Sequence, residues 1–209
     1  MGDIIHKRLG ILGSGKGSNF KAIFRAIESG EIPAEAVLVV SDVPDAGILA
    51  LADKFGVPAK YIPPGNYRAR LSDEAEKDYI DAFKEAGADW VILAGFMRVL
   101  KSSFLQAFPE KIVNIHPSLL PSFPGLRAWE QALDYRVKFT GCTVHLVDRG
   151  VDTGTILGQE PVPVLDDDNA DTLHQRIQES EWGLYPKILS ALMNDKIQIV
   201  GRNAVWKKD

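Results

Sequence analysis

The amino-acid sequence predicts an α/β fold with a mostly parallel β-sheet, helices on both faces of that sheet and an antiparallel C-terminal portion. Three observations support this prediction. Short apolar runs alternate with segments of helical spacing, which is the pattern of parallel strands joined by helices. Residues 90–94 and 112–115 are apolar enough for strands covered on both faces. Residues 140–147 and 156–164 alternate between polar and apolar side chains, as antiparallel neighbours do.

In the first half of the chain, each apolar run is followed by an amphipathic segment. The third of these segments has charged residues along one face, which is typical of a surface helix. We expect strands at residues 8–12, 37–41, 59–62 and 90–94, and helices at residues 19–29, 46–55, 72–86 and 102–108.

The second half contains the antiparallel part. A proline-rich turn at 117–124 ends the strand at 112–115, because proline cannot continue a central ladder. The run Asp-Asp-Asp-Asn at 166–169 is typical of a helix N-cap. Besides the strand pair, we expect helices at residues 128–135 and 170–194 and short terminal strands at 197–200 and 203–205.

Composition limits the class of protein. The 209 residues are 45% hydrophobic and 25% charged, enough for one substantial core, and we expect one domain over residues 1–209. A net charge of -4 and a pI near 5.6 argue against nucleic-acid binding. No apolar run approaches a membrane span, and residues 1–7 lack the apolar stretch of a signal peptide, so we expect a cytoplasmic protein without a membrane partner.

Cys142 is the single cysteine, which excludes an intrachain disulfide and a cysteine cluster for zinc. It stands three positions before His145 in an expected strand, so the two side chains point to opposite faces and do not form a nucleophilic pair. We expect Cys142 to pack in the core.

The segment 114–121, Asn-Ile-His-Pro-Ser-Leu-Leu-Pro, carries the clearest functional signal. Asn114 and His116 share one face of the expected strand, while Val113 and Ile115 occupy the other. Pro117 stops the strand where the polar pair emerges. A polar pair that only forms local hydrogen bonds at a strand end is the alternative.

The segment 13–19, Gly-Ser-Gly-Lys-Gly-Ser-Asn, joins the first expected strand to the first helix. Its glycines let backbone N–H groups converge on one point, next to the positive end of a helix, which is typical of a phosphate site. Two common phosphate motifs do not fit: Lys16 is followed by glycine rather than Ser or Thr, and the dinucleotide pattern needs glycine at Ser18. An ordinary glycine-rich turn is the alternative.

Two more segments resemble parts of a site. Residues 94–100 leave a buried strand with apolar side chains, as the wall of a pocket for a flat ring would. Residues 148–154 place Asp148 and Asp152 in a glycine-bracketed loop, and a carboxylate beside an imidazole orients it and favours its protonated form. A simple strand-to-helix turn and turn-forming aspartates are the respective alternatives.

Taken together, these four segments resemble one family, the folate-dependent glycinamide ribonucleotide formyltransferases of purine synthesis. The matching pieces are residues 13–19, 94–100, 114–125 and 141–154, in family order and over essentially the whole chain. The resemblance implies a Rossmann-like formyltransferase fold, 10-formyltetrahydrofolate as co-substrate without a metal, and glycinamide ribonucleotide as acceptor. A monomer or homodimer is expected.

The resemblance also assigns residues. Asn114, His116 and Asp152 match the catalytic trio, Gly17, Ser18 and Asn19 match the substrate phosphate loop, and Gln178 and Glu181 match the residues that hold the ribose and glycinamide part. The folate pocket is matched by Met97, Arg98, Val99, Leu100, Asn114, Asp148, Arg149, Gly150, Val151 and Asp152. The family also has an arginine for the glutamate tail of the folate; both Arg68 and Arg70 are candidates, and we favour Arg68.

The implied reaction is a direct transfer in which Asn114 and protonated His116 donate hydrogen bonds to the developing oxyanion. Three alternatives stay open. A formyltetrahydrofolate hydrolase would use the same trio but carries an additional N-terminal domain, whereas the first strand here begins within about ten residues of Met1. A methionyl-tRNA formyltransferase would add a C-terminal RNA-binding domain and a basic surface. A non-catalytic phosphate- or nucleotide-binding module is the third.

Overall fold

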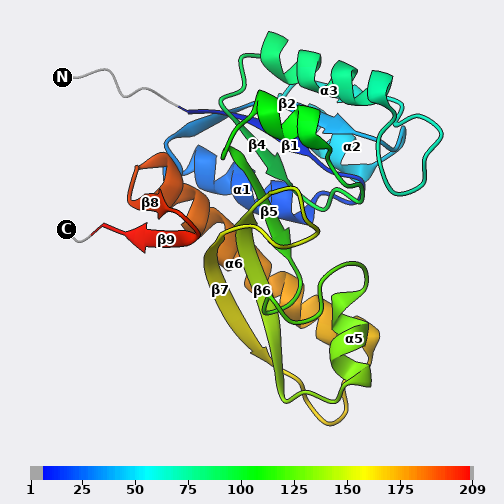
Figure 1. The fold of residues 1–209 in the computed structure, drawn as a ribbon, viewed down its shortest axis with the longest axis vertical. Helices are drawn as coiled ribbons and strands as arrows, with labels where there is room; N and C mark the ends of the chain where they lie inside the picture. Colours follow the sequence, from blue (N-terminus) through cyan, green and yellow to red (C-terminus); the bar gives the residue numbers. More distant parts are fainter. Residues whose placement is uncertain (1–6, 208–209) are drawn as a thin grey trace. The chain divides into compact units, whose positions relative to one another are not determined.

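The computed structural model describes residues 7–207. Of residues 1–7, in which no signal peptide is expected, only Lys7 is among the described residues. The chain forms two compact units, divided between Val113 and Asn114 (Figure 1). The first contains β1 (Lys7–Leu12), α1 (Ser18–Glu28), β2 (Ala34–Ser41), α2 (Gly47–Lys54), β3 (Ala59–Tyr61), α3 (Asp73–Glu85), β4 (Trp90–Leu93) and α4 (Ser102–Ala107). Strand β5 (Ile112–His116) leads into the second, which contains α5 (Ala128–Asp134), β6 (Phe139–Leu146), β7 (Ile156–Pro163), α6 (Ala170–Met193), β8 (Ile197–Val200) and β9 (Asn203–Trp206).

In the first unit, the strands β3, β2, β1 and β4 are parallel and neighbour one another in that order. The apolar run of β1 makes it the buried centre, since Leu9, Ile11 and Leu12 have no exposed surface. Gly10 in the same strand allows α3 to approach: a Cβ at this position would lie 2.3 Å from the ring of Phe83. The absence of a side chain in β1 therefore makes room for an aromatic ring of the covering helix.

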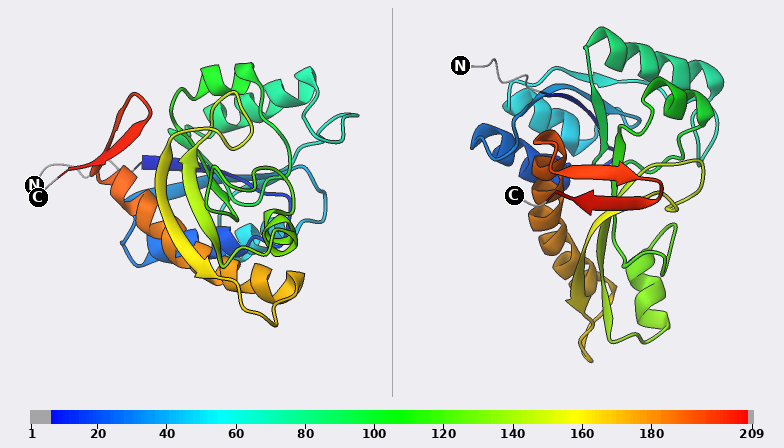
Figure 2. Two further views of the ribbon diagram at one scale, coloured as in Figure 1. Left: turned by 60° about the horizontal axis from the view of Figure 1, so that its bottom comes forward. Right: turned by 60° about the vertical axis from the view of Figure 1, so that its left-hand side comes forward.

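Helices α1 and α2 contact each other, as do α3 and α4, and Figure 2 shows the two pairs on opposite faces of the strands of this unit. The buried positions of α1 recur at three- and four-residue intervals, which is why this helix covers the sheet with one face. Full burial of a phenylalanine side chain such as Phe20 or Phe83 stabilises the fold by about 1.5–3 kcal/mol. Aromatic rings fill both layers, namely Phe20, Phe24 and Phe55 beside α1 and α2, and Phe83, Phe104 and Phe108 beside α3 and α4.

In the second unit, β6 and β7 form an antiparallel pair, and α6 lies along them (Figure 1). Gly158 of β7 lets the helix come close, because a Cβ there would lie 2.5 Å from Cδ1 of Ile188. The predicted N-cap before α6 is confirmed: the Asn169 side chain accepts from the backbone N–H groups of Asp171 and Thr172 in a capping box. The short strands β8 and β9 form a separate antiparallel hairpin after α6.

The predicted fold class is confirmed. A seven-stranded sheet runs in the order β3-β2-β1-β4-β5-β6-β7 through the described residues, and its antiparallel pair is at the C-terminal side of the sequence as expected. Strand β2 begins at Ala34, three residues earlier than predicted, because residues 34 and 36 are buried before the continuous apolar run starts. Between residues 7 and 207, no helix combines the length and the apolar character needed to span a membrane.

Candidate active site

The strand end predicted to carry a site is the end of β5, where Asn114 and His116 lie. β5 includes both residues, and His116 is only 5% exposed although it lies at the last position of the strand. Two side chains that are distant in sequence, His145 of β6 and Asp152 of the following loop, complete the cluster. The second unit thus brings together the amide, imidazole and carboxylate that the sequence singled out.

Both ring nitrogens of His116 face hydrogen-bond acceptors. Nδ1 lies 3.3 Å from Oδ2 of Asp152, and Nε2 lies 2.9 Å from the backbone carbonyl of Phe123. A carbonyl and a carboxylate only accept, so the cationic imidazole, with a proton on each nitrogen, can donate to both neighbours. The ring is therefore held at two points in a defined orientation.

Asp152 is placed by the segment between β6 and β7, residues 147–155, which we call the Asp152 loop. Its Oδ2 also accepts a 2.8 Å hydrogen bond from the backbone N–H of Gly125. Asp152 itself adopts a left-handed backbone conformation with φ of 55°. Gly154 makes the turn possible, because a Cβ there would lie 1.7 Å from the carbonyl oxygen of Leu146. Strained and crowded backbone of this kind persists only where its surroundings hold it.

Within the loop, Asp148 forms the internal hydrogen bonds. Its Oδ1 accepts from the backbone N–H of Gly150 at 3.0 Å and from the hydroxyl of Thr153 at 2.7 Å. The two aspartates therefore differ in role: Asp148 shapes the turn, and Asp152 contacts the imidazole of His116. The exposed Val151 stands between them, with 52% of its surface accessible.

His145 belongs to this cluster, although the sequence did not identify it as a site residue. Its Nδ1 lies 2.9 Å from the Leu146 carbonyl and must carry a proton to bond there. Burial lowers the pKa of His145, so the ring is neutral and its Nε2 accepts from the Asn114 side-chain amide at 3.3 Å. The 3.7 Å contact between Nε2 and Asp152 is for the same reason not an ion pair. His145 thereby sets which way the Asn114 amide faces.

The turn after His116 is held by Thr143 of β6. Its hydroxyl donates to the Ser118 carbonyl at 2.7 Å and accepts from the Leu120 backbone N–H at 3.0 Å. Gln159 of β7 donates to the same hydroxyl and to the Leu120 carbonyl, both at 2.9 Å. Side chains on the antiparallel pair therefore position the proline-rich turn, and only the fold could reveal this.

In the first unit, the glycine-rich loop ends at Gly17, the N-cap of α1. Gly17 has φ of 80°, and a Cβ there would lie 2.9 Å from Cα of Ile48, so no other residue fits without strain. The cap has no side-chain hydrogen bond to the helix, and Ser18 and Asn19 form the first turn of α1. The three predicted phosphate-loop residues are thus consecutive at a helix N-terminus.

The predicted pocket wall at 94–100 is partly exposed. Met97 and Val99 expose 59% and 45% of their surfaces, whereas Phe96 and Leu100 are buried. The Arg98 guanidinium is engaged within the unit: Nε donates to Asp42 at 2.6 Å, and Nη1 donates to the carbonyls of Tyr67 and Arg68. Arg98 therefore fastens the segment that carries the two candidate tail-binding arginines.

Both of these arginines border one hollow. It has a volume of about 430 Å³ and is lined by Tyr67, Arg68, Ala69, Arg70, Val99 and Lys101. The guanidinium of Arg70 stacks over the Tyr67 ring at 4.0 Å. The hollow combines cations with apolar surface, which suits a ligand with a carboxylate.

On α6, the predicted residues Gln178 and Glu181 lie three positions apart and so share one face of the helix. Glu181 is 5% exposed and Gln178 is half-buried. Burial raises the pKa of nearby Cys142 to about 12, and the charge of Glu181 contributes to this shift. The predicted buried position of Cys142 is confirmed, with its Sγ 3.7 Å from the Ser180 hydroxyl. Within residues 7–207, no group of three His, Cys, Asp or Glu side chains could hold a metal ion.

An amide, an imidazole and a carboxylate gathered at a strand end of an α/β sheet are typical of group-transfer enzymes, because amide and imidazole donors can stabilise negative charge on a carbonyl oxygen. Residues 7–189 match the family model described as Formyl transferase, and the chain belongs to that family.

Named relatives agree with the family match. The chain is 37% identical over 187 residues to phosphoribosylglycinamide formyltransferase of Bacillus subtilis, covering 90% of this chain and 95% of that protein. It is 43% identical over 190 residues to the trifunctional purine biosynthetic protein adenosine-3 of Drosophila melanogaster, of which the match spans only 14%. The crystal structure of glycinamide ribonucleotide transformylase 1 from Symbiobacterium toebii superimposes with a TM-score of 0.92 at 40% identity, covering 97% of this chain and 95% of that one.

Proposed function

We propose that this protein transfers the formyl group of 10-formyltetrahydrofolate to the amine of glycinamide ribonucleotide, as a step of purine biosynthesis. The main support is the cluster around His116. Nδ1 of His116 lies 3.3 Å from Asp152, and His145 orients the amide of Asn114 on the same strand. The names of the Bacillus subtilis and Symbiobacterium toebii relatives support the choice of substrates.

In the proposed reaction, the acceptor amine attacks the formyl carbon, and a new C–N bond forms while the carbonyl electrons move onto oxygen. Asn114 and the His116 imidazolium donate hydrogen bonds to that oxyanion. The bond between the formyl carbon and the folate nitrogen then breaks. A proton moves from the attacking amine to the departing nitrogen, through His116 or a water that it holds. Asp152 provides the negative charge that stabilises the cationic ring.

Two contacts determine how the donors become available. His145 accepts one N–H of the Asn114 amide, so the other N–H is the one to serve the oxyanion. His116 donates Nε2–H to the Phe123 carbonyl in this structure, and it must exchange this partner for the substrate oxygen. Because the Asp152 contact is at the other nitrogen, the exchange leaves the ion pair intact.

We propose ligand roles for the remaining residues of the sequence prediction. The phosphate of the acceptor binds to backbone N–H groups at Gly17, Ser18 and Asn19, a role supported by their place at the start of α1. Gln178 and Glu181 hold the ribose and glycinamide part. The folate binds along Met97, Arg98, Val99, Leu100, Asn114 and residues 148–152, with Arg68 at its glutamate tail.

Arg98 takes part through its backbone in this proposal, since its guanidinium is bonded to Asp42. We further propose that both units form one formyltransferase domain, because the family match extends across their boundary. A cytoplasmic monomer or homodimer that needs no metal completes the proposal.

The experiment follows the formyl carbon. The protein is incubated with 10-formyltetrahydrofolate carrying ¹³C in the formyl group and with glycinamide ribonucleotide, and products are analysed by mass spectrometry. We expect the label in formylglycinamide ribonucleotide, with one tetrahydrofolate released for each product. Label in free formate alone would favour the hydrolase, and unconsumed co-substrate would favour a non-catalytic module.

A further inference from the structure

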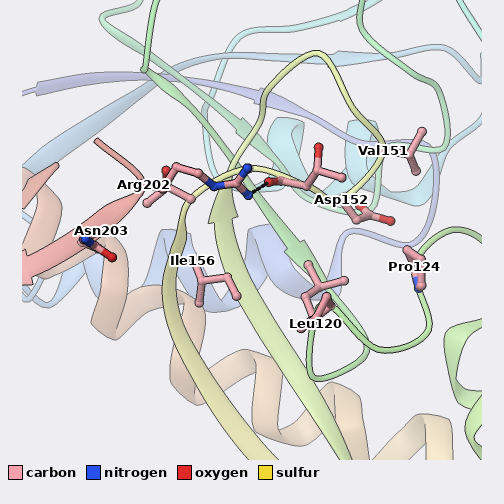
Figure 3. A pocket seen from close by; sticks show the side chains of 12 residues that line it. Leu120, Pro124, Val151, Asp152, Ile156, Arg202 and Asn203 are labelled. Carbon is pink, nitrogen blue, oxygen red and sulfur yellow. Dashed lines mark hydrogen bonds between the residues drawn. The ribbon is translucent and has the colours of Figure 1, made fainter. Parts of the chain in front are cut away.

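The side of the Asp152 loop that faces the C-terminal hairpin is poorly packed. A hollow of about 500 Å³ separates the two, and Figure 3 shows side chains from both around it. Its lining residues come from the turn after β5, from the loop and the start of β7, and from the hairpin, namely Leu120, Pro121, Pro124, residues 151–156 and residues 202–204. Apolar packing therefore cannot fix the loop on this side.

One side chain crosses the hollow. Arg202, at the turn between β8 and β9, donates from Nη2 to the backbone carbonyl of Thr153 at 2.8 Å (Figure 3). Thr153 directly follows Asp152, so the contact is one residue away from the carboxylate that faces His116. A guanidinium donor to a carbonyl is a charge-assisted hydrogen bond, which is stronger than a neutral one.

The other contacts of the loop do not replace this one. Asp148 bonds to Gly150 and Thr153 within the loop itself, and the Leu146 backbone N–H bonds to the Thr155 carbonyl at its base. These bonds lie within the loop and at its base, so none of them joins the loop to the C-terminal hairpin. From outside the loop, Gly125 and His116 contact the carboxylate of Asp152, whereas Arg202 contacts the backbone that follows it.

We propose that Arg202 is a positioning residue, which holds the backbone after Asp152 so that its carboxylate stays on Nδ1 of His116. The C-terminal hairpin, which contributes no group to the proposed chemistry, thereby supports catalysis from outside the site. This role of Arg202 rests on the proposed function, since it acts through the role proposed there for Asp152.

Three variants of the whole chain test it. Arg202→Ala removes the donor, Arg202→Lys keeps a cation that can reach the carbonyl, and Gln198→Ala changes an exposed side chain of the same hairpin that lines no part of the hollow. We expect Arg202→Ala to lower kcat about 5- to 20-fold with KM for glycinamide ribonucleotide unchanged. Arg202→Lys should recover most of this loss, and Gln198→Ala should match the wild type.

A double variant shows whether the effect passes through Asp152. In an Asp152→Asn background, Arg202→Ala should cost less than about twofold, since the contact it supports is already impaired. An undiminished 5- to 20-fold loss in that background would overturn the inference, as would a kcat of Arg202→Ala equal to that of Gln198→Ala.

Amide hydrogen exchange gives a readout that does not depend on the reaction. Arg202→Ala should raise exchange across residues 148–154 relative to the wild type and Gln198→Ala, while β6 stays protected. If Asp152→Asn kept full activity, the proposed role of Asp152 would fail, and the exchange data would still decide the role of Arg202. Unchanged loop exchange in Arg202→Ala would refute it whatever the activity shows.

Discussion

Replacing Asp152 by asparagine removes the charge next to His116 with little change in shape. The carboxylate is 13% exposed and contacts the ring nitrogen at 3.3 Å and the Gly125 N–H at 2.8 Å. An asparagine oxygen in the place of Oδ2 can still accept from the Gly125 N–H and from Nδ1 of His116. The variant should therefore fold normally and bind both ligands.

The size of the effect follows from the lost attraction. At 3.3 Å and an effective dielectric constant of about 20, two unit charges attract by about 5 kcal/mol. At 1.36 kcal/mol for each factor of ten, this sets an upper limit between 1,000- and 10,000-fold on the loss of rate. Water and salt screen a partly exposed pair, so we expect turnover to fall about 100- to 1,000-fold.

The assay is kcat and KM from formylated product across pH 5 to 9, with Asp166→Asn as the matched control. Asp166 is 96% exposed and forms a surface ion pair with Lys138, so this control should keep wild-type kinetics. The pH profile of Asp152→Asn should differ from that of the wild type. A normal kcat and an unchanged profile in a folded variant would refute the assignment of Asp152.

Three further outcomes are expected. His116→Ala should lower kcat about 100-fold or more, which is the usual size of a general acid–base contribution, and its circular dichroism spectrum should not change. Wild-type turnover in this variant would remove His116 from the mechanism. Gly17→Val should weaken glycinamide ribonucleotide binding about tenfold or more in calorimetry and leave folate binding within twofold, because the Cβ would lie 2.9 Å from Ile48; equal losses of both ligands would contradict a phosphate role. Burial lowers the pKa of His145, so the unfolded chain binds more protons just below pH 6.5 and the free energy of unfolding should fall as the pH drops from 7 to 5. His145→Gln should flatten this slope in urea titrations, and an unchanged slope would show that another group, such as His174, causes it.

Local pattern was sufficient to predict most of the fold. The alternation of β5 correctly placed Asn114 and His116 at the end of a buried strand, and the Asp-Asn run correctly marked the start of α6. Both features depend on neighbours within a few residues, where periodicity and capping preferences act.

Long-range contacts could not be predicted in the same way. The spacing in the expected strand correctly placed His145 on the face of the sheet opposite Cys142, but it did not identify His145 as a site residue. That it meets Asn114, 31 residues away, depends on strand order and register. The pairing of Arg98 with Asp42 and of Arg202 with Thr153 likewise joins segments 56 and 49 residues apart. No local spacing encodes such contacts.

In the proposed reaction the acceptor amine, and not water, takes the formyl group at His116. The most direct measurement is the rate of tetrahydrofolate release from 10-formyltetrahydrofolate, with and without glycinamide ribonucleotide, in the wild type and in His116→Ala. We expect little release without the amine, a rise of at least 100-fold on its addition to the wild type, and no such rise in the variant. Rapid release by the wild type without any amine would contradict this proposal.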